Sequence, residues 1–149
     1  MSLELTINND IKEAMKAKDK IRLEALRGIK KEILEAKSAK GAASEISDTD
    51  VVKIIQKMVK QRKDAAALFS GQDRADLADK ELEEIKAIEG YLPAQMSREE
   101  LVGAVKVIIE KVGATSMKEM GKVMGMASKE LAGKADGKDI SVVVKELLG

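Results

Sequence analysis

The spacing of apolar residues along the chain predicts a succession of helices. Apolar side chains that recur at every third or fourth position lie on one face of a helix. A first helix has this spacing from Leu3 to Met15, and Asp19 is a candidate N-cap for a second helix. The apolar faces are expected to hold Leu3, Ile7, Ile11 and Met15 in the first helix and Leu23, Leu26, Ile29, Ile33 and Leu34 in the second.

A small and polar segment, residues 38–47, follows the second helix and predicts a flexible connection. Ser47 and the acidic residues after it are suited to cap a long third helix that ends near Gly71. A fourth helix is expected over residues 74–89 from its apolar positions, and Gly90 with Pro93 is expected to stop it. The inward residues are expected to be Val51, Ile55, Met58, Val59, Ala66 and Phe69 in the third helix and Leu77, Ala78, Leu82, Ile85 and Ile88 in the fourth.

The chain is expected to divide into two helical parts at residues 91–97. Only 1% of the residues are aromatic and one is proline, whereas Ala, Leu, Glu, Lys and Met are frequent, and these favour helices over strands. The sequence therefore predicts an all-α protein. It would consist of an N-terminal bundle of about four helices, residues 1–92, and a small three-helix C-terminal module, residues 93–149.

The C-terminal module contains two patterns typical of helix starts. Ser97 and Glu100 form a capping box, which opens a helix that Gly113 closes. Residues 116–119 repeat the capping pattern and predict a second helix start. The remaining boundaries are expected near Leu131, at a Gly-rich connection over residues 133–137, and at Asp139 or Ser141, either of which is suited to cap the last helix.

The composition excludes several classes of enzyme. None of the 149 residues is His or Cys, so the chain cannot form a Ser-His-Asp triad, a Cys nucleophile or an ordinary zinc site. Paired acidic residues occur, but none lies in the glycine-containing pattern of a calcium loop. We therefore expect no metal, no cofactor and no intrinsic catalysis.

The sequence also bears on the cellular compartment. Zero cysteines fit a reducing compartment, and the first ten residues lack the basic leader and the apolar run of a targeting peptide. No window of about 18 apolar residues is present that could form a membrane-spanning helix. We therefore expect a cytoplasmic protein that has no membrane partner.

Charged residues balance overall, with 27 basic and 26 acidic side chains, but they are unevenly distributed. On a helical wheel of about 100° per residue, Lys53, Lys57 and Lys60 lie opposite Ile55 and form a single stripe. Such a stripe could follow a phosphate backbone, where each neutralised phosphate releases a counterion. The alternative is an ordinary solvated helix face.

Arg62 has an unusual position on the same helix. It lies within about 20° of Ile55 on the wheel, and a guanidinium on this apolar face needs an acceptor. We expect a buried ion pair with an acidic residue of the fourth helix, and the alternative is an arginine exposed in a binding groove. The candidate partners are Asp76, Asp79 and Glu83.

The C-terminal module has two further segments that could bind a partner. Met120 and Met124 lie beside Gly121 and Gly125, and adaptable thioethers next to small residues suit close approach by another molecule. Core filling and a close helix crossing are the alternatives. The run GKADG, residues 133–137, lacks the spacing of a Walker A loop, so we interpret it as a turn whose lysine could contact phosphate.

Four motifs, taken together, carry a resemblance to a known family. They are QRKD at residues 61–64, YLPAQMS at 91–97, MGKVMG at 120–125 and GKADG at 133–137. In this order and spacing they resemble the GatB/YqeY domain family over nearly the whole chain. The resemblance implies an all-helical fold with an N-terminal bundle and a small C-terminal module. It also relates the chain to the tail of the B subunit of the glutamine-dependent tRNA amidotransferase and to a domain of some glutaminyl-tRNA synthetases, where the domain is thought to hold the tRNA body.

The resemblance implies a non-catalytic tRNA-binding accessory module associated with glutamine-dependent tRNA amidation, with an amidotransferase or an aminoacyl-tRNA synthetase as a further partner. The family label, a carbon–nitrogen ligase activity with glutamine as amide donor, belongs to other domains and subunits. The alternative is a protein-interaction adaptor that docks through Met120 and Met124. The candidate tRNA contacts are Lys53, Lys57, Lys60, Lys122, Lys134 and Lys138, and the residues expected to serve structure are Arg62, Asp64, Tyr91, Pro93, Gly121 and Gly125.

Overall fold

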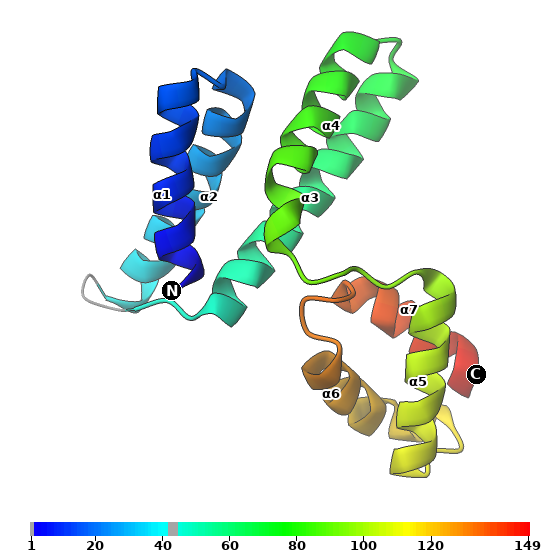
Figure 1. Cartoon of the computed structure of the whole chain (residues 1–149). Coiled ribbons are helices and arrows are strands. Elements are labelled where there is room, and N and C mark those ends of the chain that lie inside the picture. Colours follow the sequence, from blue (N-terminus) through cyan, green and yellow to red (C-terminus); the bar gives the residue numbers. More distant parts are fainter. Residues whose placement is uncertain (1, 42–44) are drawn as a thin grey trace. The chain divides into compact units, whose positions relative to one another are not determined.

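The computed structural model describes residues 2–41 and 45–149. In these two ranges the chain forms α-helices and short 3-10 helices and no strand, which confirms the all-α prediction (Figure 1). No helix within them is long and apolar enough to cross a membrane. The elements are α1 (Leu3–Ala17), α2 (Lys20–Lys40), α3 (Asp48–Gly71), α4 (Ala75–Ile88), η1 (Glu89–Tyr91), α5 (Arg98–Val112), η2 (Met117–Glu119), α6 (Met120–Glu130) and α7 (Gly137–Leu148).

The connection between α2 and α3 is shorter than expected, because α2 continues to Lys40 and so takes up the first residues of the segment 38–47. Residues 42–44 of this connection lie outside the described ranges. The chain groups into two compact units, Met1–Leu92 and Pro93–Gly149, each with its own core.

In the first unit, α2 packs against α1, α3 and α4, while α3 and α4 form a long antiparallel pair (Figure 1). Three residues expected to point inward are instead half exposed: Met15 (52%), Leu34 (52%) and Leu82 (47%). A strict four-residue spacing drifts around a helix by about 40° per step, so the buried face of α1 continues through Ala14 and leaves Met15 outside. The core of this unit is formed by Ile7, Ile11, Ala14, Ala25, Leu26, Ile29, Ile33, Val51, Ile55, Met58, Val59, Ile85 and Ile88.

Side-chain caps fix several helix starts as predicted. The Asp19 carboxylate accepts a hydrogen bond from Arg22 N–H at 3.2 Å, and the Ser47 hydroxyl accepts one from Asp50 N–H at 3.1 Å. Ser97 and Glu100 form the predicted capping box at the start of α5. These bonds satisfy amide groups that a helix leaves unpaired in its first turn.

Two helix starts in the second unit differ from the prediction. Ser116 makes no side-chain cap, and the chain enters a 3-10 turn before α6. The Glu119 carboxylate is used elsewhere, because it accepts a hydrogen bond from Thr115 N–H at 3.4 Å. The last helix begins at Gly137 with Asp136 as N-cap, ahead of the expected caps at Asp139 and Ser141.

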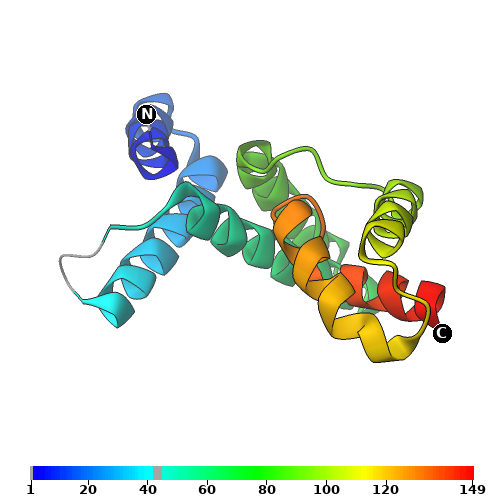
Figure 2. The same ribbon diagram turned by 90° about the horizontal axis from the view of Figure 1, so that it is seen from below.

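The second unit is built from α5, α6 and α7, and α6 and α7 lie side by side (Figure 2). The segment before α5 is tied to the connection between α6 and α7. The Gln95 side-chain amide donates to the carbonyl oxygens of Pro93 at 2.8 Å and of Gly133 at 2.7 Å, and Met96 N–H donates to Lys134 O at 2.9 Å. The core contains Leu101, Val105, Ile108, Ala114, Val123, Ala127, Leu131, Ile140, Val143 and Val144.

Lys18 ends α1 in the left-handed region, with φ of 56°, and this conformation disfavours residues that carry a Cβ atom. Lys18→Gly is predicted to raise the free energy of unfolding by about 0.5 to 1 kcal/mol, because glycine adopts this conformation without steric cost. Thermal or urea unfolding measures the change. Lys12→Gly, in the exposed interior of the same helix, is the control and should lower stability by about 1 kcal/mol. A loss of stability in Lys18→Gly would contradict the described C-cap.

Candidate nucleic-acid interface

The outward face of α6 combines small and basic residues. On the helical wheel, Val123 and Ala127 point into the core, and Gly121, Gly125 and Ser128 lie on the opposite side. These three residues are exposed, as are the basic residues Lys122 and Lys129, which flank them on one side. The face is therefore a low ridge of small residues with lysines along one edge.

The two glycines of this ridge have no role in packing that the structure reveals. A Cβ atom built at Gly121 or Gly125 would meet no atom within 4 Å, so the close helix crossing considered above does not occur at these positions. A glycine inside a helix lowers stability by about 0.5 to 1 kcal/mol relative to alanine. The two glycines therefore lower the stability of α6, and the space beside them is open to solvent.

Three lysines in α6 and in the turn before it are not used in ion pairs within the unit. Lys118, Lys122 and Lys129 form no ion pair in the part of the chain that the structure describes, whereas Lys111 pairs with Glu130 at 3.8 Å. An unpaired ammonium group remains available to an external anion. These three lysines and the glycine ridge are referred to below as the α6 face.

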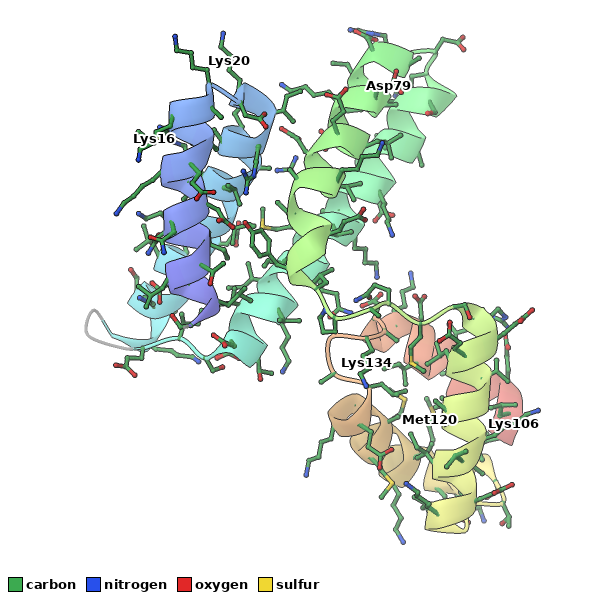
Figure 3. All side chains as sticks on the ribbon, viewed as in Figure 1. Lys16, Lys20, Asp79, Lys106, Met120 and Lys134 are labelled. Atoms are coloured by element: carbon green, nitrogen blue, oxygen red, sulfur yellow. The ribbon has the colours of Figure 1, made fainter. Side chains whose placement is uncertain are left out.

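The structure does not bring Lys122, Lys134 and Lys138 into one cluster. Lys122 lies in the first turn of α6, and eight residues of helix, about 12 Å along its axis, separate it from Glu130. Lys134 lies beyond that end of α6, in the connection to α7 (Figure 3), and Lys138 lies in the first turn of α7. Lys134 and Lys138 therefore share the opposite end of α6 from Lys122, and both side chains are exposed.

Met120 and Met124 lie on the other edge of the α6 ridge. Both side chains are half buried and pack against the core of the second unit, together with Met126. Their thioethers therefore fill space between helices, and only part of each side chain faces solvent. Met117, in the turn before α6, is more exposed at 42%.

The stripe predicted on α3 is present in part. Lys53 and Lys57 are exposed, whereas Lys60 is half buried. The half-buried Asp50 lies near the start of this stripe, and its pKa is lowered, first by a hydrogen bond from Lys40 and only last by the charge of Lys53. The first two lysines thus form a short basic edge on α3.

Arg62 lies between α3 and α4 and is bound by two acidic residues. Its guanidinium contacts the buried carboxylate of Glu84 and pairs with Glu81 at 3.3 Å. Helix α2 passes close to this ion pair, because a Cβ atom built at Gly28 would lie 3.7 Å from the Arg62 guanidinium and 3.2 Å from Met58 Cε. The predicted buried ion pair is therefore present, and α2 approaches it closely at a glycine.

The partners predicted for Arg62 were wrong. Asp76 pairs with Arg74 at 3.2 Å, and Asp79 (Figure 3) and Glu83 are exposed. The error came from the phase of α4, because the helix turns Glu84 inward together with Ala78 and Ile85. An inward face that includes a carboxylate cannot be found by searching for apolar residues alone.

The remaining signature residues have different surroundings. The Tyr91 hydroxyl donates to Asp10 of α1, and burial followed by this hydrogen bond raises the pKa of Tyr91 to about 12. Pro93 is exposed, and its carbonyl oxygen accepts from Gln95. Asp64 is exposed and, among the residues described, forms no ion pair that would explain a structural role.

No group of three or more acidic residues suited to hold a metal ion occurs in residues 2–41 and 45–149. The chemistry available at the α6 face is therefore that of lysine ammonium groups and exposed backbone. Such groups bind anions by charge and close approach.

The fold and these basic faces define a small helical protein of two units with exposed, unpaired lysines. A family model described as YqeY-like protein matches residues 4–148, so the chain belongs to the YqeY-like protein family. This match confirms the resemblance found in the four sequence motifs.

Several fungal proteins are similar to the chain, and six of them carry the name altered inheritance of mitochondria protein 41, mitochondrial. The protein of Kluyveromyces lactis is 32% identical over 136 residues, which cover 90% of this chain and 69% of the relative. That of Pyrenophora tritici-repentis is 29% identical over 144 residues, covering 94% and 77% respectively. That of Vanderwaltozyma polyspora is 31% identical over 126 residues, covering 78% and 65%.

These names correct the expectation of a cytoplasmic protein, because all three relatives are named as mitochondrial. The expectation rested on the absence of cysteine and on the residue types at the start of the sequence. Cysteine content does not distinguish one reducing compartment from another.

Glu84 gives the N-terminal unit a predictable pH dependence. Burial raises its pKa above the ordinary value of 4.5, and the opposing charge of Arg62 offsets this only in part. The folded state therefore holds the proton more tightly than the unfolded state. The resulting stabilisation is fully present below pH 4.5 and is lost as the pH rises through the raised pKa.

Glu84→Gln is predicted to flatten this decrease, because an amide of similar size does not titrate. Chemical unfolding at a series of pH values from below 4.5 to neutrality measures the slope. Glu83→Gln, which changes the exposed neighbouring carboxylate, is the control and should keep the slope of the unmodified protein. An unchanged slope in Glu84→Gln would show that Glu84 does not carry the effect.

Proposed function

We propose that the protein is a non-catalytic tRNA-binding accessory module and that the α6 face contacts the sugar–phosphate backbone of tRNA. The observation that carries this proposal is the open ridge at Gly121 and Gly125 beside lysines without an ion pair. A bulky anionic backbone can approach such a ridge closely, and the lysines then neutralise its phosphates.

The kind of recognition follows from the residues that are absent from the face. The sequence has one Tyr, one Phe and no Trp, and both aromatic residues belong to the first unit. Base stacking is therefore excluded as a large contribution at the α6 face. The binding is expected to depend on phosphate positions and helix shape, with little sequence preference and a steep dependence on salt.

Other basic residues in each unit are further candidates for contact with tRNA phosphates. Lys134 and Lys138 offer a second phosphate contact near the start of α7, and Lys53 and Lys57 offer a basic edge on α3. Association with glutamine-dependent tRNA amidation, through an amidotransferase or an aminoacyl-tRNA synthetase, rests on the resemblance to the GatB/YqeY domain family. The proposal assigns no catalytic residue.

The adaptor alternative has less support from the surface. Met120 and Met124, the residues proposed to dock a protein partner, pack against the core of their own unit. Replacing them with charged residues would disturb folding as well as binding, so such variants do not separate the two functions. The exposed lysines of the α6 face can be changed without this complication.

Lys122→Glu combined with Lys129→Glu is predicted to weaken binding to bulk tRNA and to reduce its salt dependence. The slope of log K against log salt concentration should fall in magnitude by about 1 for each lost phosphate contact. Fluorescence anisotropy over a salt series measures both quantities.

The matched control is Lys106→Glu together with Lys145→Glu, which makes the same change in charge at exposed positions of α5 and α7. This variant should bind tRNA more strongly than the α6 variant and should retain the original salt slope. Equal losses in both variants would indicate a non-specific effect of net charge and would contradict a contact at the α6 face.

A further inference from the structure

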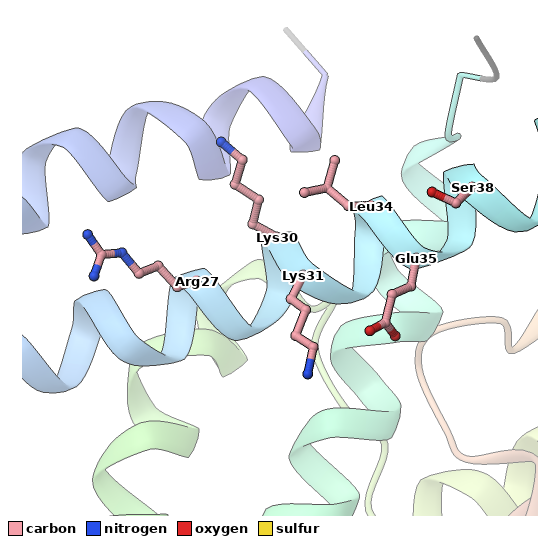
Figure 4. Close-up of a pocket in the computed structure, with 6 residues that line it drawn as sticks. All are labelled: Arg27, Lys30, Lys31, Leu34, Glu35 and Ser38. Atoms are coloured by element: carbon pink, nitrogen blue, oxygen red, sulfur yellow. The ribbon is translucent and has the colours of Figure 1, made fainter. Parts of the chain in front are cut away.

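A second unexplained surface lies on α2, on the side opposite its buried face. A shallow hollow with a volume of about 500 Å³ runs along this helix, and Figure 4 draws the side chains that line it. Successive residues of the hollow are separated by three positions or by one, so they share one helix face. The residues that line it are Arg27, Lys30, Lys31, Leu34, Glu35 and Ser38.

The basic residues of this hollow differ from the others in α2. Lys37 pairs with Glu4, Lys40 pairs with Asp50 at 3.2 Å, and Arg22 lies 3.9 Å from Asp10. In contrast, Arg27, Lys30 and Lys31 are exposed and make no hydrogen bond or ion pair through their side chains within the described ranges. The hollow therefore contains three cationic side chains that form no ion pair with the described residues, and Glu35 is the one acidic residue that lines it.

The basic face continues onto α1. The ion pair between Glu4 and Lys37 shows which sides of the antiparallel helices α1 and α2 meet. On helical wheels, Lys12 and Met15 of α1 lie on the same side as Glu4, and Lys30 and Leu34 of α2 lie on the same side as Lys37. In Figure 4, Lys30 and Leu34 point toward α1. The two helices therefore present one continuous surface.

This surface also exposes aliphatic side chains. Leu34 is 52% exposed, and on α1 Met15 is 52% and Leu5 is 54% exposed. They lie among Lys12, Arg27, Lys30 and Lys31, and we call this set the α1–α2 face. Aliphatic side chains on a cationic surface gain little from a phosphate chain in water. They gain free energy when they enter an apolar layer that lies beneath anionic groups.

We propose that the α1–α2 face binds the surface of an anionic lipid bilayer. The cations would lie at the level of the lipid phosphates, and Leu5, Met15 and Leu34 would enter the boundary with the acyl chains. From the sequence we expected no membrane partner, because the chain has no apolar segment long enough to span a bilayer. That criterion does not apply to a protein that binds flat on the bilayer surface. This binding is independent of the tRNA contact proposed for α6.

The test is sedimentation of the full chain with vesicles of mixed phosphatidylglycerol and phosphatidylcholine, compared with vesicles of phosphatidylcholine alone. The protein is expected to bind the anionic vesicles and not the neutral ones. Lys30→Glu with Lys31→Glu should weaken binding by at least about 25-fold, since each cation near the surface contributes about fivefold. Leu34→Ser should weaken it by about tenfold, because an inserted aliphatic side chain is lost.

The matched control is Lys53→Glu with Lys57→Glu on α3, which has the same charge change and should bind the vesicles like the unmodified protein. Absence of binding to anionic vesicles at low salt would overturn the proposal. So would equal losses in the α2 and α3 variants, or unchanged binding of Leu34→Ser. If the α2 variant lost tRNA affinity but kept vesicle binding, the face would be an RNA contact and the lipid proposal would be wrong.

Discussion

The assembly of the N-terminal unit depends on one partly buried guanidinium, that of Arg62. Arg62 on α3 contacts Glu84 and Glu81 on α4, and α2 passes close to the same guanidinium at Gly28. Loss of one partner from a buried ion pair costs about 3 to 5 kcal/mol, because the other charge is left uncompensated. An apolar contact would tolerate several rotations of α4 about its own axis, whereas this ion pair requires Glu84 to face inward. It therefore fixes which residues of α4 are buried and which face solvent.

Elsewhere in the protein, some basic side chains form ion pairs within the chain, whereas others remain available to an external ligand. Lys37, Lys111 and Arg98 each pair with an acid on another helix. The lysines of the α6 face and of the α1–α2 face have no such partner in the described chain. The two surfaces differ in what surrounds the cations, since α6 offers glycines and the α1–α2 face offers half-exposed aliphatic residues. We therefore assign different anionic ligands to them.

The sequence predicted much of the fold, because helix periodicity and caps are local properties. Asp19, Ser47 and Ser97 cap helices as expected. The partner of Arg62 could not be found in this way, since the phase of α4 depends on contacts with α2 and α3. The lysines of α6 were partly predicted, but only the structure reveals that a Cβ at Gly121 would meet no neighbour. The basic face of α2 was missed, although the spacing of Arg27, Lys30, Lys31 and Leu34 opposite Ile29 was present in the sequence.

The central claim, that the open ridge of α6 accepts an RNA backbone, is tested most directly by Gly125→Leu. Because a Cβ atom built at this position meets no atom of the protein within 4 Å, the folded state is expected to be retained and its free energy of unfolding to rise by up to about 1 kcal/mol. Affinity for tRNA at fixed low salt should nevertheless fall by about tenfold or more, since the leucine holds the phosphate backbone away from the lysines. Unchanged tRNA affinity in a stably folded Gly125→Leu protein would contradict the account.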